Sequence, residues 1–193
     1  DMIMFKEIFI RIYQLIMRPS AAWQKMDEQG EVAQSLFFSR FLFPIMGIAA
    51  LSCFGNVLGE EFNAQTLEHV LRLAIVEFVK FFIGFYFLVF LLKEILPSFS
   101  GVREKEHIER FVGSLLALYM TVDIVVNILP KGFSFLEYAV LGIFYVIWTG
   151  AKIFLHIDDS KQRTFTLIVT IIVLVVPIIV ERILYLMMPG INR

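Results

Sequence analysis

Seven polar side chains interrupt the apolar stretches of this sequence, and they are its strongest candidates for chemistry. A charged side chain inside a membrane costs several kcal/mol unless it is paired or hydrated, so such residues are functional candidates by default. At about 1.5 Å per helical residue, all of them fall in the same outer half of the bilayer. The seven are Glu77, Lys80, Asp123, Asn127, Glu137, Glu181 and Arg182.

Two interpretations of this intramembrane polar cluster remain open. In the first, the charges are buried pairs that fix helix register: Lys80 neutralises Glu77 or Asp123, and Arg182 neutralises an acid of the fourth or fifth apolar segment. In the second, the cluster lines an outward-facing hydrated cavity for a cation, a proton or a polar headgroup. The cluster has more acids than bases, which favours a positively charged ligand or one protonated carboxylic acid.

Other kinds of chemistry find little support in the sequence. No phosphate-binding loop, nucleophile elbow, zinc-protease motif or dinucleotide fingerprint is present, so no catalytic residue is predicted. The single cysteine, Cys53, excludes an internal disulfide. His69 is expected on the opposite side of the membrane from His107 and His156, so no metal site or other cofactor is expected. A net charge of −1 argues against nucleic-acid binding.

The composition indicates an integral membrane protein. Of 193 residues, 59% are hydrophobic and only 18% are charged, against about 25% charged in soluble domains. Apolar runs of about 20 residues are long enough to span a bilayer as helices, and they lack the alternation of a barrel. We therefore predict an all-α bundle of five transmembrane helices in a single domain over residues 1–193. The predicted spans are about 36–58, 70–92, 108–129, 135–154 and 165–188.

Basic residues predict the orientation of these spans. Lysine and arginine are frequent in the N-terminal region and in the second and fourth links, and scarce in the first and third links. Basic residues accumulate on the cytoplasmic side of membrane proteins. We therefore expect a cytoplasmic N-terminus and a C-terminus outside.

Residues 2–29, the N-terminal foot, precede the first span. Residues 2–17 repeat apolar residues at helical spacing with basic residues mostly elsewhere on the wheel, which predicts an amphipathic interfacial helix. Pro19 ends this helix and begins a second one, in which Trp23 is expected to anchor at the membrane interface. The foot either lies on the lipid surface or packs under the bundle; the alternative is a docking surface for a cytoplasmic protein partner.

Pro19 followed four residues later by Trp23, then five spans, resembles the Yip1-domain family. The resemblance implies a five-span fold with a cytoplasmic N-terminus and, for a compact bacterial-type chain, location in the inner membrane. Eukaryotic members are tied to Rab GTPases. This sequence lacks their long N-terminal region and their DLYGP-type motif, so the Rab role is not carried over.

Two functions follow as expectations. The first is a non-catalytic protein that organises membrane lipids or binds a partner; the alternative is a small transporter or channel that uses the polar cluster. Small residues at Gly113, Ala117 and Thr121 and a GxxxG at Gly55 and Gly59 predict close helix packing within the chain. A homodimer formed through these small residues is the alternative.

Overall fold

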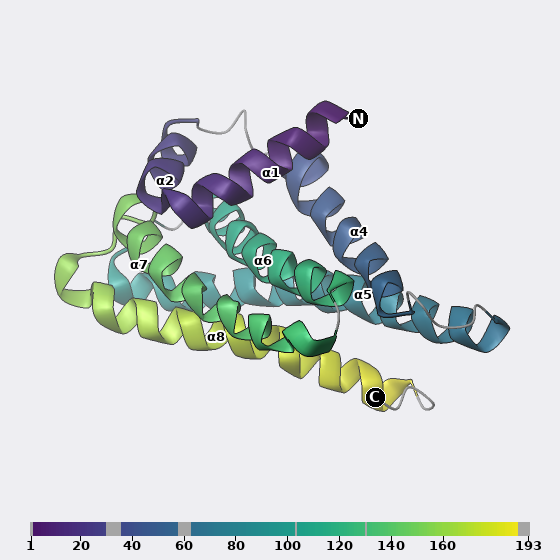
Figure 1. The fold of residues 1–193 in the computed structure, drawn as a ribbon. Coiled ribbons are helices and arrows are strands. Elements are labelled where there is room, and N and C mark those ends of the chain that lie inside the picture. Colours follow the sequence, from purple (N-terminus) through teal and green to yellow (C-terminus); the bar gives the residue numbers. More distant parts are fainter. Residues whose placement is uncertain (1, 30–35, 58–62, 103, 130, 189–193) are drawn as a thin grey trace.

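Helices make up every element of the part of the chain that the structure describes. The computed structural model describes residues 2–29, 36–57, 63–102, 104–129 and 131–188. Its elements are α1 (Met2–Met17), α2 (Pro19–Glu28), η1 (Phe38–Leu42), α4 (Phe43–Ser52), η2 (Cys53–Val57), α5 (Ala64–Phe99), α6 (Lys105–Ile128), η3 (Lys131–Gly142), α7 (Ile143–Ile153) and α8 (Asp159–Met187) (Figure 1).

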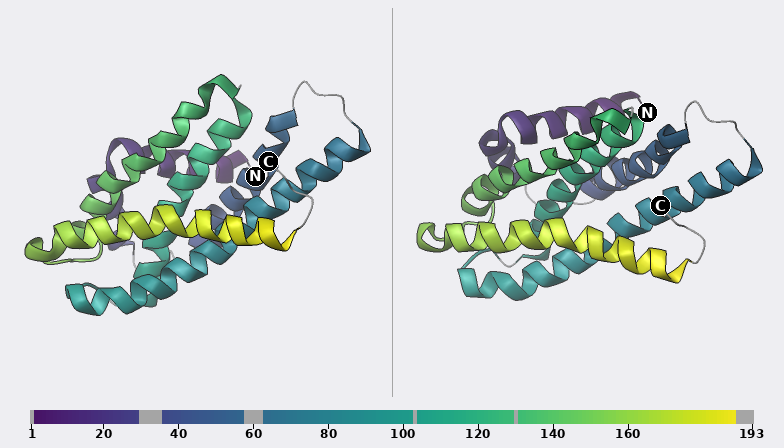
Figure 2. Two further views of the ribbon diagram at one scale, coloured as in Figure 1. Left: turned by 90° about the horizontal axis from the view of Figure 1, so that it is seen from below. Right: turned by 60° about the horizontal axis from the view of Figure 1, so that its bottom comes forward.

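Five of these segments are long and apolar enough to cross a membrane. They are Phe38–Gly55, Ala64–Phe99, Lys105–Ile128, Phe135–Ile153 and Asp159–Met187. Figures 1 and 2 show them packed as one bundle, with α1 and α2 lying across one end. The prediction of an all-helical, five-span membrane protein is confirmed.

The helices of the second and fifth spans are longer than the predicted spans. α5 has 36 residues and is therefore about 54 Å long, whereas the hydrocarbon core is about 30 Å thick. The predicted span ended at residue 92, but the helix continues through Pro97 to Phe99 and is followed by Ser100, whose φ of 61° is left-handed. Pro97 cannot donate a hydrogen bond to the preceding turn, and this loss falls in the last turn of the helix.

The first and fourth spans are composite, which the hydropathy pattern did not predict. The first begins as the π-helix η1 and continues as α4, whereas the fourth begins as the 3₁₀ helix η3 and continues as α7. A 3₁₀ segment of 12 residues is unusually long. It leaves Phe135 and Tyr138 60% and 74% exposed at the end of the bundle far from α2.

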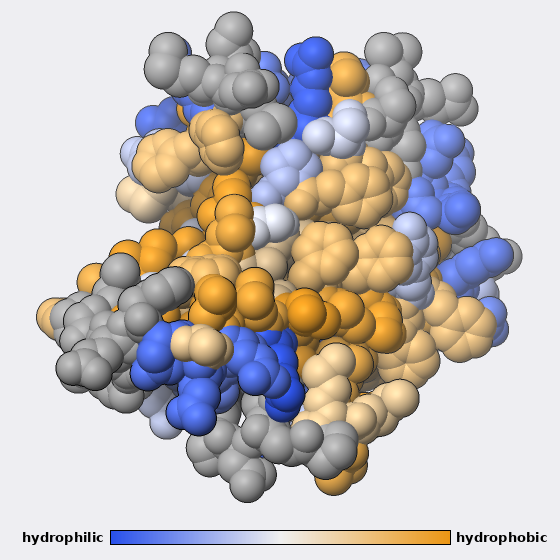
Figure 3. Space-filling model, turned by 90° about the vertical axis from the view of Figure 1, so that its right-hand side faces the viewer, coloured by the Kyte–Doolittle hydropathy of each residue, from blue (hydrophilic) through white to orange (hydrophobic). Residues whose placement is uncertain are grey.

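The core lies between α5 and its neighbours α4, α6 and α8, while α7 packs against α8. Phe81, Phe85, Phe111 and Phe165 are fully buried there. The outer surface of the spans is also apolar, as in a protein whose solvent is lipid. Figure 3 shows this apolar surface across the middle of one face, with hydrophilic residues toward its edges.

Two of the predicted small residues make close contacts within the chain. A Cβ atom at Gly113 of α6 would lie 2.7 Å from the ring of Phe37, and one at Gly55 of η2 would lie 2.4 Å from the backbone oxygen of Asn127. Ala117 is also fully buried, and Gly59 lies outside the described residues. The small residues therefore serve packing between spans of one chain.

Candidate functional site

Trp23 attaches α2 to the bundle. Its side chain is fully buried, and its ring centroid lies 5.2 Å from the centroids of both Phe111 and Phe154. The indole Nε1–H donates a hydrogen bond of 3.0 Å to the carbonyl oxygen of Val146 in α7. Gly150 makes this approach possible, because a Cβ atom there would lie 2.7 Å from Cε2 of Trp23. α2 is thus held by a closely fitted aromatic contact.

This placement differs from the expectation that Trp23 anchors in the lipid headgroup layer. The ring is surrounded by protein, because Gly150 opens a site between two aromatic rings and Val146 supplies the acceptor that the indole N–H needs. Pro19, the other residue singled out in the foot, is the first residue of α2 and is buried as well. The foot is therefore held by the bundle itself.

Arg110 makes a second connection between the foot and the bundle. Its side chain lies at the start of α6 and is 2% exposed. Its Nη1 donates a hydrogen bond of 2.9 Å to the carbonyl oxygen of Met26, in the last turn of α2. The guanidinium also lies over the ring of Phe154, 5.3 Å from the centroid. Because a positive charge favours a helix C-terminus, this contact suits the end of α2.

Asp27 of α2 lies between two histidines. Its Oδ1 is 3.6 Å from Nε2 of His107 and its Oδ2 is 3.6 Å from Nε2 of His156, and both distances are too long for hydrogen bonds. The Nδ1 of His107 lies 2.9 Å from Oε2 of Glu104 but is not aligned for a hydrogen bond. Within the described ranges, no group of three His, Cys, Asp or Glu side chains is placed to hold a metal ion.

The intramembrane polar cluster contains a triad of charges, two of them buried and the third partly exposed. Lys80 Nζ lies 2.8 Å from Oε2 of Glu77 and 3.0 Å from Oδ2 of Asp123, which joins α5 to α6. Glu77 and Lys80 are 6% and 5% exposed. Oε1 of Glu77 is buried without a hydrogen-bond partner among the described residues. With every group ionised, the triad carries one excess negative charge.

The other four residues of the predicted cluster are distributed differently. Glu181 of α8 is close enough to the triad to interact electrostatically with Lys80. Asn127 Nδ2 donates a hydrogen bond of 3.0 Å to Oγ of Ser52, which ties the ends of α6 and α4 together. Glu137 and Arg182 are exposed, and neither forms an ion pair with another described residue. The structure therefore places Glu181 near the triad. Glu137 and Arg182 lie apart from the triad.

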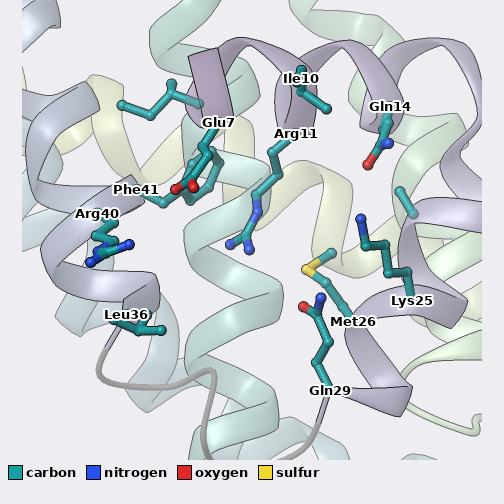
Figure 4. A pocket seen from close by; sticks show the side chains of 12 residues that line it. Glu7, Ile10, Arg11, Gln14, Lys25, Met26, Gln29, Leu36, Arg40 and Phe41 are labelled. Atoms are coloured by element: carbon teal, nitrogen blue, oxygen red, sulfur yellow. The ribbon is translucent and has the colours of Figure 1, made fainter. Parts of the chain in front are cut away.

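A cavity of about 560 Å³ lies under α1, between α2 and the start of the first span (Figure 4). Arg11 of α1, Lys25 of α2 and Arg40 of η1 line it together with Glu7. The Arg11 guanidinium lies over the ring of Phe41, 4.8 Å from the centroid. Burial lowers the pKa of Arg11 from its ordinary value, and the negative charge of Glu7 acts in the opposite direction.

The charged and apolar faces of α1 are therefore oriented opposite to those of a typical surface helix. Ile8 and Leu15 pack inward beside Arg11, whereas most of the large apolar side chains point away from the bundle. We call these outward-facing residues the α1 stripe: Phe5, Phe9, Tyr13 and Ile16, which are 51%, 71%, 55% and 54% exposed. The sequence shows the amphipathic pattern, but it cannot show which face the bundle covers.

Comparison with known proteins gives one match. A family model described as the Yip1 domain matches residues 13–180, which cover the end of α1, all of α2, the first four spans and most of the fifth. No curated protein and no solved structure matches the chain.

Proposed function

This chain belongs to the Yip1 domain family, and from that premise we propose that it is a non-catalytic membrane-organising protein. In this proposal, the α1 stripe lies in the lipid of the cytoplasmic leaflet while α2 holds α1 at a fixed place on the bundle. The observation that carries the proposal is the outward orientation of the α1 stripe on a helix that the protein itself holds in place.

Lipid is the occupant that best suits the α1 stripe. Phe5, Phe9, Tyr13 and Ile16 follow one another at spacings of four, four and three, so they share one face of the helix. Removing a large apolar side chain from water stabilises a protein by about 1.5–3 kcal/mol. The α1 stripe would gain this stabilisation in lipid and would lack it in water. Lys6 is exposed on the same helix, as expected for a helix on an anionic surface.

The attachment of the foot gives this insertion a structural consequence. A free amphipathic helix can leave the membrane or change its depth, whereas α1 is joined to α2, and α2 is held by Trp23 and Arg110. Each copy would then add the volume of one helix to one leaflet, at a constant distance from the spans. The basic residues of the foot support the cytoplasmic leaflet and, in a bacterial cell, the inner membrane.

The test uses a fluorophore on α1 and quenching by lipids brominated along their acyl chains. Phe9→Cys is labelled in a Cys53→Ser background, and Gln24→Cys, on an exposed position of α2, is the matched control. After reconstitution of the full chain into vesicles, we expect strong quenching at position 9 and little at position 24. Equal quenching at both positions would refute the insertion of α1. A photo-crosslinker at position 9 that joins a single protein in native membranes would instead favour the partner-binding role.

A second candidate function, transport of a cation or proton, is favoured by one specific observation. The triad has one excess negative charge, and Oε1 of Glu77 is buried without a hydrogen-bond partner among the described residues. A small cation or a proton would satisfy that oxygen. The low exposure of Glu77 and Lys80 supports a buried structural role instead, so we place transport second.

Ion flux separates the two candidates. Proteoliposomes containing the full chain are loaded with a pH-sensitive dye or a potassium-sensitive dye, and a proton gradient or a potassium gradient is applied accordingly. Transport predicts a flux that Glu77→Gln abolishes, whereas Glu137→Gln, which changes an exposed carboxylate outside the triad, leaves it intact. The organising role predicts that the native protein and both variants match empty vesicles.

A further inference from the structure

We propose that the cavity under α1 binds the phosphate group of an anionic phospholipid. Three separate segments each contribute one cation to this cavity: Arg11 from α1, Lys25 from α2 and Arg40 from η1. Figure 4 shows the three side chains around the same space. The inference rests on the proposed position of the foot at the membrane surface.

The net positive charge of the cavity favours binding of an anion. Among the described residues of the lining, three cations and the carboxylate of Glu7 give a formal charge of +2. None of the three cations forms an ion pair with a carboxylate elsewhere in the described part of the chain. Like charges gathered in a partly enclosed space repel one another, and a bound anion relieves that repulsion. A phosphodiester is the anion that a membrane surface supplies most readily.

Arg11 is suited to hold such a phosphate. Its guanidinium lies over the rings of Phe37 and Phe41, at 5.5 Å and 4.8 Å from their centroids, so its plane is positioned before any ligand arrives. A guanidinium presents several N–H donors in a rigid fork that matches two phosphate oxygens. Gln14 and Gln29, which also line the cavity, can donate further hydrogen bonds.

The size and the lining of the cavity fit a lipid better than a free anion. A volume of about 560 Å³ is within the range of small-molecule sites and exceeds what inorganic phosphate needs. Apolar side chains, including Ile10 and Leu36, share the lining with the cations, so the glycerol end of a lipid would find apolar contact. The α1 stripe, on the outer side of the same helix, would bring acyl chains close by.

The experiment measures which lipids stay on the purified protein. The full chain is placed in nanodiscs of equal parts phosphatidylcholine and phosphatidylglycerol, released into detergent and analysed by native mass spectrometry. Both lipids carry a phosphodiester, but the choline cation of phosphatidylcholine would be repelled by the three cations of the cavity. We therefore expect about tenfold enrichment of phosphatidylglycerol, which corresponds to about 1.4 kcal/mol. Arg11→Gln and Arg40→Gln should bring the ratio close to one. Arg18→Gln, the same change on an exposed residue that does not line the cavity, should leave the ratio unchanged.

A second measurement distinguishes a lipid from free phosphate and shows that the variants are folded. Thermal unfolding in detergent is followed with dioctanoyl-phosphatidylglycerol or with inorganic phosphate as the added ligand. We expect the short-chain lipid alone to raise the unfolding temperature, and only while Arg11 and Arg40 are present. Equal protection by inorganic phosphate, or none by either ligand, would overturn the proposal.

The test of the phosphate site can fail while the test of the proposed function succeeds, and the reverse is also possible. Equal retention of the two lipids, together with quenching of the label at position 9, would overturn the phosphate site and leave the insertion of α1 intact. Enrichment of phosphatidylglycerol that depends on Arg11, without quenching at position 9, would refute the insertion and support the phosphate site.

Discussion

Replacing Trp23 with alanine should release the foot and spare the bundle. Truncating a buried tryptophan costs about 3–5 kcal/mol, because aromatic contact is lost and a cavity remains. In this chain the lost interactions are the two ring contacts with Phe111 and Phe154 and the hydrogen bond to Val146. Since about 1.4 kcal/mol corresponds to a factor of ten, hydrogen-exchange protection in α2 should fall by about two to three and a half orders of magnitude.

A milder substitution separates packing from hydrogen bonding. Trp23→Phe keeps an aromatic ring and loses the indole N–H. The carbonyl of Val146 also accepts a hydrogen bond of 3.0 Å from Thr149 Oγ1, so it is not left unsatisfied. We therefore expect a loss of only about 1 kcal/mol from the missing hydrogen bond. The assay is hydrogen–deuterium exchange in nanodiscs, read peptide by peptide across α2 and the spans.

The complementary change at Gly150 tests the same contact from α7. A Cβ atom there would lie within 2.8 Å of Trp23 and of Phe111, so Gly150→Ala should cost about 1–3 kcal/mol through overpacking. In the Trp23→Ala background much of that clash disappears, so the two changes should be strongly non-additive. Unchanged protection of α2 in Trp23→Ala, additive effects of the two changes, or equal loss of protection in α5 and α8 would refute the reasoning.

Two further predictions concern the spans. Lys80→Met should lower the free energy of unfolding in detergent by about 3–5 kcal/mol, because two carboxylates lose their buried partner. Combining Lys80→Met with Glu77→Gln and Asp123→Asn should restore most of that loss. A triple variant no more stable than Lys80→Met alone would contradict this. Ser100→Gly should raise the free energy of unfolding by about 1 kcal/mol, because the φ of 61° at this position suits glycine better than serine. An unchanged or lower melting temperature would argue against this.

The hydrophobic runs predicted the number of spans because membrane insertion depends on length and composition, both of which a sequence displays. Their ends were predicted less well, because polar residues such as those near Ala64 and Phe99 can continue a helix beyond the hydrocarbon core. The composite first and fourth spans depend on local backbone hydrogen bonding, which hydropathy does not report.

The candidate sites were likewise predicted only in part. The i, i+3 spacing of Glu77 and Lys80 and the depth of Asp123 predicted that they could pair. The exposure of Glu137 depends on the 3₁₀ geometry of η3, which the sequence did not suggest. The surroundings of Trp23 were not predictable, because Val146 lies 123 residues further along the chain. The cationic cavity was missed, because its three cations were counted only as signs of orientation.

The long separation between Trp23 and Val146 has a consequence for synthesis. A ribosome adding about 5–20 residues each second needs roughly 6–25 seconds to proceed from the first to the second. During that interval the three earlier spans can enter the membrane, but the acceptor for the indole and the glycine beneath it have not yet been made. The segment translated first thus reaches its final place only after the fourth span has arrived. Until then, the contacts with Val146 and Gly150 cannot hold the nascent foot.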